Sequence, residues 1–201
     1  MPERKPRKDA ERNRKAVLEA ADALFTRCAG PDEVTMADIA AEAGVGKGTA
    51  VRAFGDRTGL LRALYEARLA TLEQAIETGP PPLGPDAPPV ERIPALLDAV
   101  LCFKLDNRSL TLALEESGST SPYQAAYYER WHGLLTSMLE QVPHLTGGDF
   151  IAHALLAATR ADLVEHLTER GGVLREELRA QLASFAARVV GSHPRQTTTE
   201  H

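Results

Sequence analysis

The twenty residues from Thr35 to Phe54 constrain what this chain can fold into more than any other stretch. They contain two short helical patterns joined by the tight turn Ala43-Gly44-Val45. Gly44 suits the end of a helix because glycine tolerates a positive φ, which lets the chain reverse at once. Asp38 follows Thr35 at the spacing of a capping box, which predicts where the first helix begins. These signals together predict a helix-turn-helix.

The second helical pattern, which we expect to start at Gly46, has an apolar face and an outward face. We expect the apolar face to bury Val45, Ala50 and Phe54. The outward face presents Lys47, Thr49, Arg52 and Ala53. Short or cationic side chains are what a helix needs to approach base edges in the major groove of DNA. The alternative is an ordinary helical hairpin whose two cations are solvated surface charges.

This stretch, with Gly55-Asp56-Arg57 and Leu60-Leu61 after it, resembles the DNA-binding signature of the TetR (tetracycline repressor) family. The matching residues are Thr35, Ile39, Ala40, Ala43, Gly44, Val45, Gly48, Thr49, Phe54 and Leu60. Gly46, Ala50, Val51 and Ala53 stand where the family has Ser, Leu, Tyr and His. The family's Tyr and His help to hold phosphates, so that role does not pass to Val51 and Ala53. Arg57 replaces the family's Lys and can still contact a phosphate.

The resemblance implies an all-α protein, with an N-terminal three-helix helix-turn-helix domain and a larger C-terminal helical domain for ligand binding and dimerisation. It also implies a transcriptional regulator, in its expected form a repressor that a small-molecule effector releases from a palindromic double-stranded DNA operator. The DNA-binding residues that we predict are Thr35, Lys47, Gly48, Thr49, Arg52 and Arg57. The nearer alternative is a DNA-binding protein that needs no ligand.

Charge is distributed unevenly along this acidic chain of net charge −5. Residues 1–70 contain 13 Lys and Arg against 11 Asp and Glu, a net charge of +2, so the remaining residues carry −7. The densest basic run extends from Arg4 to Lys15. We expect it to be disordered alone and to neutralise phosphates beside DNA. A solubilising tail is the alternative.

Apolar spacing and helix-breaking residues divide the chain into five segments. Helical periodicity begins at Asn13, and the segment 79–89 contains six of the 13 prolines, which favours a semi-stiff spacer. The predicted segments are an N-terminal arm and helix-turn-helix domain (1–55, with the motif at 35–54), a connecting helix (56–78), a proline-rich linker (79–89), a helical effector-binding and dimerisation domain (90–190) and a disordered tail (191–201).

Three helices are expected to close the C-terminal domain. Ser121-Pro122 suits the start of the first, Asp149 can cap a second that continues to Leu167, and a third follows Gly171-Gly172. The resemblance implies that the last two helices pair with those of a second copy, forming a homodimer. The predicted interface residues are Ala154, Ala158, Leu178, Leu182, Phe185 and Val189. A monomer that buries both helix faces internally is the alternative.

A ligand pocket is expected among the helices between Ile93 and Leu167. Aromatic, aliphatic and a few polar side chains together can line an apolar pocket with polar points. The predicted pocket residues are Phe103, Tyr127, Trp131, His132, Met138 and Arg160. The alternative for each is a place in the core or at its rim.

Patterns for catalysis, metal binding and membrane insertion are weak. Glu129 and His132 form an E-x-x-H without the second copy that a carboxylate-bridged metal bundle requires. Asp162 and His166 are too few ligands for a tight site. No apolar run approaches the roughly 20 residues of a membrane helix, and Cys28 and Cys102 fit no metal spacing. We therefore expect a cytoplasmic protein with no catalytic residues, metal, cofactor or membrane partner; a helical-bundle metallo-enzyme is the remote alternative.

Overall fold

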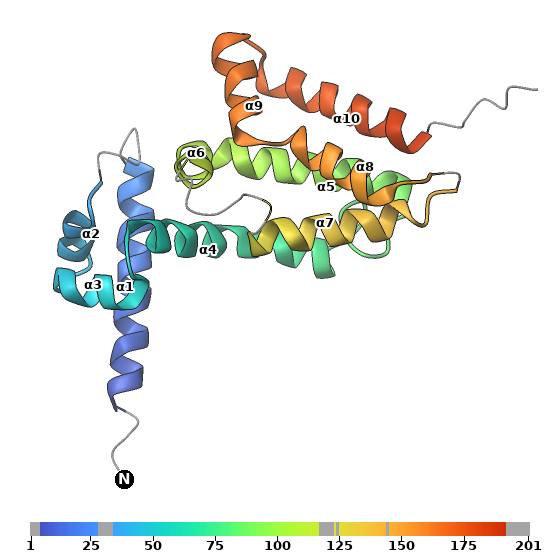
Figure 1. Cartoon of the computed structure of the whole chain (residues 1–201). Coiled ribbons are helices and arrows are strands. Elements are labelled where there is room, and N and C mark those ends of the chain that lie inside the picture. The colour runs from blue at the N-terminus through green and yellow to red at the C-terminus, as the bar shows by residue number, and fades with distance from the viewer. Residues whose placement is uncertain (1–4, 28–33, 117–122, 124, 144, 192–201) are drawn as a thin grey trace, which may run out of the picture. The chain divides into compact units, whose positions relative to one another are not determined.

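A computed structural model describes residues 5–27, 34–116, 123, 125–143 and 145–191 of the 201-residue chain (Figure 1). Every regular element within these ranges is a helix, which confirms the predicted all-α class. None of the described helices is both long and apolar enough to span a bilayer. The chain folds as two compact units, Met1–Ala70 with Asn107–Ser119, and Thr71–Asp106 with Thr120–His201.

The first unit is built on three helices that pack against one another: α1 (Lys5–Arg27), α2 (Met36–Glu42) and α3 (Lys47–Phe54) (Figure 1). The N-terminal part of α4 (Arg57–Thr78) and the short α6 (Arg108–Glu116) complete it. Apolar residues three or four apart form its core, because that spacing places them on one face of a helix. The buried apolar residues among the described ones of this unit are Val17, Ala20, Ala21, Val34, Ile39, Ala40, Ala50, Leu60, Leu61, Leu64, Tyr65, Leu69 and Leu110.

We expected the basic run from Arg4 to Lys15 to be disordered, with helical periodicity from Asn13. This prediction is wrong for most of the run, because α1 begins at Lys5. Ion pairs line its exposed surface, with Arg12 3.2 Å from Asp9 and Lys15 3.6 Å from Glu19. Each such pair adds only about 0.2 to 0.5 kcal/mol. Extension costs little, however, once the packed part of a helix has formed, since each further residue adds a hydrogen bond.

The boundary between the units lies between Ala70 and Thr71, inside α4, and not at the proline-rich segment 79–89. That segment is folded into turns instead of an extended spacer. The Gly84 N–H donates to the Pro80 carbonyl at 3.0 Å, and a Cβ on Gly84 would lie 1.7 Å from the Gly79 oxygen. Arg92 fixes the turn by donating to the carbonyls of Leu83 (2.9 Å) and Ile76 (2.7 Å). Carbonyls that a polyproline spacer would leave to water are therefore satisfied within the protein.

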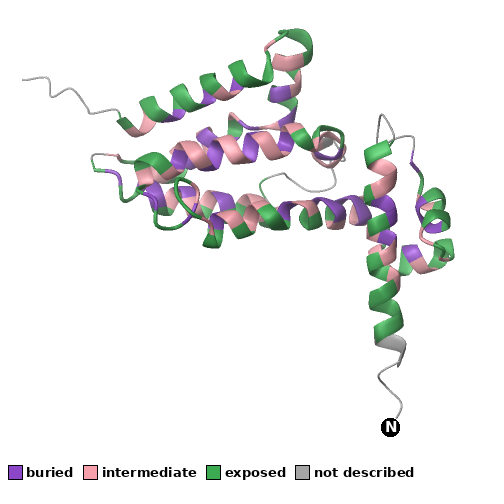
Figure 2. Ribbon diagram, turned by 180° about the vertical axis from the view of Figure 1, so that it is seen from behind, coloured by how far each residue is buried: buried purple, intermediate pink, exposed green. Residues whose placement is uncertain are grey.

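The second unit is a layered arrangement of α5 (Pro89–Asp106), α7 (Ala126–Leu139), α8 (Gly148–Ala157) and α10 (Arg175–Gly191). Helix α5 packs on α10 and α7, and α8 packs on α7. Figure 2 shows buried residues concentrated along α5, from which this core is built. Its members include Ile93, Leu96, Leu97, Leu101, Trp131, Leu135, Met138, Leu139, Leu155, Leu156, Leu178 and Leu182.

The single helix expected over 150–167 is interrupted. Helix α8 ends at Ala157, where the buried Thr159 hydroxyl donates to the Leu156 carbonyl at 2.9 Å and competes with helical bonding. Arg160, in an extended conformation, then caps α9 (Ala161–Glu165), which continues as the π-helical turn His166–Arg170.

The predicted helix starts in this unit also differ from the structure. The N-cap of α8 is Gly147, at φ +74°, and Asp149 lies one residue inside the helix, where its charge still favours the helix N-terminus. Helix α7 begins at Ala126; the start expected at Ser121-Pro122 lies outside the described residues. Gly191 closes α10, and the rest of the expected tail, 192–201, is outside them too.

Candidate nucleic-acid interface and ligand pocket

A complete capping box begins α2 and confirms the pairing of Thr35 with Asp38. The Thr35 hydroxyl donates to the Asp38 carboxylate at 2.6 Å and accepts from the Asp38 N–H at 3.2 Å, while the Thr35 N–H donates to the same carboxylate at 3.0 Å. The hydrogen bonds from the Thr35 hydroxyl and then its N–H lower the pKa of Asp38. The charged carboxylate thus fixes the first turn of α2.

The turn between α2 and α3 is closed by backbone hydrogen bonds that only a left-handed residue permits. Gly44 has φ +66°, its N–H donates to the Ala41 carbonyl at 3.1 Å, and the Val45 N–H donates to the Ala40 carbonyl at 2.9 Å. This pair of bonds is a Schellman motif, which ends α2 and turns the chain into α3. Gly46 is the N-cap of α3, so the helix starts one residue later than predicted, at Lys47.

Helix α3 presents the outward face that its sequence predicts. Ala50 is fully buried beneath it, whereas Val45 and Phe54, expected to be buried, are half-buried. Of the residues predicted to face outward, Lys47 and Arg52 are exposed, whereas Thr49 and Ala53 are half-buried. Gly48 is exposed as well. Neither cation has a hydrogen bond or an ion pair with any residue that the structure describes. Both therefore remain available to a polyanion.

Arg14 of α1 holds the C-terminal end of α3 in place. Its Nη1 donates to the Ala53 carbonyl at 2.8 Å, and its guanidinium carbon lies 4.4 Å from the centre of the Phe54 ring. This cation is therefore committed to the scaffold. At the opposite end of α3, a Cβ added to Gly48 would meet no atom within 4 Å, so the helix has a bare, open surface there.

Two of the predicted DNA contacts also have structural tasks. The Thr35 hydroxyl belongs to the capping box, and the Arg57 Nε donates to the Val34 carbonyl at 3.5 Å. Arg57 thereby ties the start of α4 to the segment before α2. Both residues lie at the N-terminal ends of helices; the capping role of Thr35 follows from its spacing to Asp38, whereas the bond from Arg57 to Val34, 23 residues earlier, does not follow from the sequence.

The six predicted pocket residues are not brought together. Trp131 and Met138 are buried in the core, and the Tyr127 ring lies 5.3 Å from that of Trp131. Phe103 is half-buried on α5. Arg160 pairs with Asp162 at 2.9 Å, and this hydrogen bonding lowers the pKa of Asp162. His132 lies beside Asp149 and His153, and the group of ligand-type side chains that these three form does not include Glu129.

The described part of the second unit contains a pocket of about 220 Å³. Of the predicted residues only Trp131 lines it; the full lining is Glu73, Ile76, Glu77, Arg92, Arg130, Trp131 and Leu134. Arg130 forms an ion pair with Glu73 across α7 and α4. Aromatic side chains in the sequence did not indicate this pocket, because most of its lining is charged or aliphatic.

The predicted interface residues fall on different faces of α8 and α10. Leu178 and Leu182 are only 5% and 6% exposed within a single chain, so they belong to its core and not to a surface. Ala154, Ala158 and Val189 are half-buried, and Phe185 is 36% exposed. Four of the seven large apolar side chains exposed among the described residues lie between positions 150 and 185: Phe150, Leu163, Leu174 and Phe185.

Comparison with known proteins locates a family domain in the first unit. Residues 17–64 match the family model of bacterial regulatory proteins, tetR family. An HTH-type transcriptional regulator of Staphylococcus aureus (strain bovine RF122) is 32% identical over 61% of this chain and 65% of its own length. The HTH-type transcriptional repressor LfrR of Mycolicibacterium smegmatis is 36% identical over 59% of each chain. The chain thus spans less than two thirds of the length of these two relatives.

Solved structures share the fold over most of the chain. A TetR-like transcriptional regulator from Rhodococcus sp. RHA1 matches with a TM-score of 0.58 and 23% identity, covering 90% of this chain and 97% of its own. LfrR from Mycobacterium smegmatis, solved in complex with proflavine, matches with a TM-score of 0.53 and 21% identity, covering 89% and 96%. At these identities the likeness establishes the fold.

Proposed function

Because this chain belongs to the tetR family of bacterial regulatory proteins, we propose that it is a sequence-specific DNA-binding transcriptional repressor. One observation carries the proposal: the exposed face of α3, where Lys47 and Arg52 have no partner among the described residues and Gly48 adds no bulk. A helix can enter the major groove only if its outward side chains are short or able to bond with the DNA.

The proposed DNA contacts divide into base-reading residues on α3 and positioning residues on the neighbouring elements. Lys47, Thr49 and Arg52 read base edges, and one good bidentate contact is worth about 1 to 3 kcal/mol of discrimination. Thr35 and Arg57 lie toward the phosphate backbone, together with exposed cations of α1 such as Lys8. Contacts of the second kind give affinity without sequence information and make binding depend on salt.

The repressor acts as a homodimer through α8 and α10. Two recognition helices about 34 to 36 Å apart would match half-sites one turn apart on a palindrome. Exposed Phe150 on α8 and Phe185 on α10 support this surface, with the half-buried Ala154 and Ala158 allowing close helix approach. Leu178 and Leu182 take no part in it, since they fill the core of each subunit.

The pocket beside Trp131 receives a small organic effector. Glu73, Ile76 and Glu77 line it from the C-terminal half of α4, and the N-terminal half of the same helix belongs to the unit that contains α3. A ligand there contacts the helix that continues into the DNA-binding unit. Its volume of 220 Å³ is below the roughly 300 to 1,000 Å³ of drug-sized sites, which favours a compact ligand. A coupling of about 1 to 3 kcal/mol would change DNA affinity roughly 5- to 150-fold.

Selection from a random pool of duplexes, followed by fluorescence anisotropy on the selected site, tests DNA binding. Arg52→Ala should weaken that site by about 1 to 3 kcal/mol and relax one base preference. Arg170→Ala is the matched control, because Arg170 is also an exposed arginine and lies in the second unit. If Arg52→Ala binds every duplex as the parent does, α3 is not the reading helix.

Tryptophan emission tests the pocket, since Trp131 is the single tryptophan of the chain and lines it. Proflavine, which LfrR binds in its crystal structure, is the first probe. It should change the emission in the absence of DNA, and Leu134→Phe, which fills the pocket, should weaken the change. Leu163→Phe, on the exposed surface of α9, should not. An unchanged emission across a panel of compact aromatic ligands would favour the ligand-independent alternative.

A further inference from the structure

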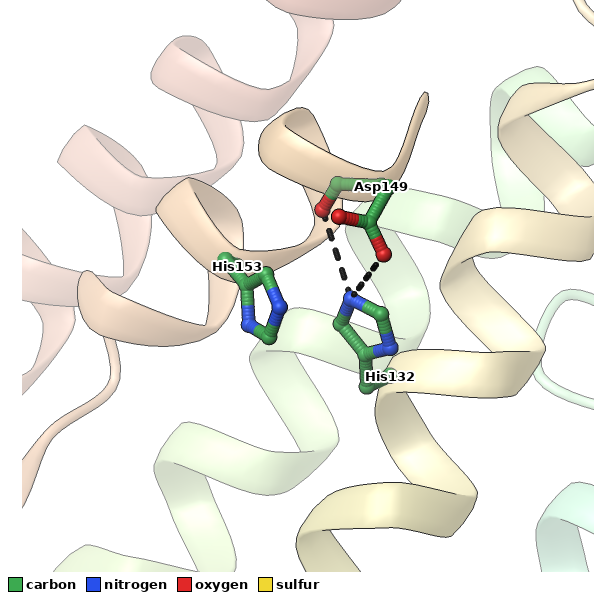
Figure 3. A group of neighbouring side chains, drawn as sticks. All are labelled: His132, Asp149 and His153. Carbon is green, nitrogen blue, oxygen red and sulfur yellow. Dashed lines mark hydrogen bonds and ion pairs between the residues drawn. The ribbon is translucent and has the colours of Figure 1, made fainter. Parts of the chain in front are cut away.

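A second cluster of side chains in the larger unit takes no part in the proposed pocket or in DNA contact. His132 of α7 lies against Asp149 and His153 of α8 (Figure 3). The His132 Nε2 is 3.4 Å from a carboxylate oxygen of Asp149 and 3.3 Å from its carbonyl oxygen. The two imidazole rings stack with their centres 3.9 Å apart. One ligand-type atom from each residue lies within 4.8 Å of the other two.

The packing of two helices holds these three groups together. Helices α7 and α8 pack directly on each other. Asp149 and His153 are four residues apart on α8, so they lie on one face of it, and that face meets His132. The His132 side chain is 18% exposed, whereas that of Asp149 is 78% exposed. The two histidines are therefore held by the fold, and the exposed carboxylate of Asp149 can rotate to complete a site.

We propose that His132, Asp149 and His153 bind a divalent transition-metal ion of the Zn²⁺ type. Imidazole nitrogen and carboxylate oxygen are established Zn²⁺ ligands, and bonds of about 2.0 to 2.1 Å in a tetrahedron place neighbouring ligand atoms about 3.4 Å apart. The ligand atoms lie within 4.8 Å of one another, so binding requires them to approach by up to about 1.4 Å, and the largely exposed Asp149 side chain has room to rotate. The fourth position is left for water. Mg²⁺ and Ca²⁺ fit less well, because they prefer six or more oxygen ligands.

Tyr128 supplies an outer partner of the kind that metal-binding histidines use. Its hydroxyl lies 2.6 Å from the His153 Nδ1, which fixes the orientation of that ring and leaves Nε2 as the nitrogen free to bind the ion. Tyr128 is therefore a positioning residue. The ion would join α7 to α8 at a site separate from the pocket beside Trp131, so it goes beyond the effector function proposed above.

Calorimetric titration of the metal-free, full-length protein with Zn²⁺ tests the site. One ion should bind per chain, and Co²⁺ in its place should give the visible absorption of a tetrahedral ion. His132→Gln and His153→Gln each remove a ligand, and should weaken Zn²⁺ binding by more than the roughly 10- to 100-fold that loss of an outer partner costs. Tyr128→Phe should fall within that range and keep the Co²⁺ spectrum, which a change of ligands would alter.

His166→Gln is the matched control, because His166 is exposed on the π-helical turn, outside the cluster. Its Zn²⁺ affinity should equal that of the parent. Zn²⁺ should also raise the melting temperature of the parent and of this control but not of the two ligand variants. Asp149→Asn, at a largely exposed side chain, gives the same test if a histidine variant fails to fold. The proposed metal site is wrong if the folded parent does not bind Zn²⁺, or if the ligand variants bind it as tightly as the parent does. DNA affinity is measured separately, so that failure of the metal site is distinguished from failure of the proposed DNA binding.

Discussion

Replacing Gly48 by Ala separates the stability of α3 from its approach to DNA, because the two should change in opposite directions. Gly48 is the second residue of α3, it is exposed, and a Cβ there would meet no atom within 4 Å. The added methyl group costs nothing within the chain. It would stand on the face that we propose to dock on the duplex, between the helix and the base edges.

The expected magnitudes follow from that position. Glycine in the middle of a helix costs about 0.5 to 1 kcal/mol relative to alanine. Gly48 is in the first turn, so the gain should be near the lower value, about 0.5 kcal/mol. If the methyl group removes one base contact, DNA binding loses about 1 to 3 kcal/mol, which is about a 5- to 150-fold weaker affinity.

Urea unfolding and fluorescence anisotropy on the selected duplex measure the two effects. Gly133→Ala is the control, because Gly133 lies in the middle of α7, is exposed, and has equally open space for a Cβ. It should stabilise the protein by up to about 1 kcal/mol and leave DNA affinity unchanged. A Gly48→Ala protein that binds DNA as tightly as the parent would refute the docking of this face. One that is less stable would refute the account of α3 itself.

Two further variants test the capping of α2 and the proposed dimer surface. The hydrogen bonds from Thr35 lower the pKa of Asp38 in the folded state. The charged carboxylate therefore stabilises the folded state at any pH above the ordinary pKa of an aspartate. This stabilisation is lost as the pH falls through the lowered pKa. The stability difference between the parent and Asp38→Asn, followed by urea unfolding, should therefore be constant near neutral pH and change in acid; a pH-independent difference would contradict the capping role. Phe185→Lys should shift the sedimentation of the protein from dimer to monomer without unfolding it, because Phe185 is exposed in the single chain. Leu174→Lys, at an exposed residue before α10, serves as the comparison. A Phe185→Lys protein that stays dimeric would place the interface elsewhere.

Sequence alone was sufficient for the helix-turn-helix, because the interactions that define it are local. The capping box joins residues three apart, and the reversal at Gly44 depends on one residue that tolerates a positive φ. The outward position of Lys47 and Arg52 follows from helical periodicity around the buried Ala50. Each of these features is encoded within a few residues of where it acts, so it could be predicted without any knowledge of the rest of the chain.

The tertiary structure decided what depends on residues far apart in the chain. Periodicity marks Leu178 and Leu182 as apolar, but only the packing of α10 on α5 shows that they face inward. Composition suggested a spacer at 79–89. In the structure this segment forms turns, and Arg92 holds it by donating to the carbonyls of Leu83 and Ile76. His132 meets Asp149 and His153, 17 and 21 residues later, because α7 and α8 pack together. Local hydrogen bonding and periodicity specify an element and its faces, and the choice of partner for each face is made by the packing of the whole unit.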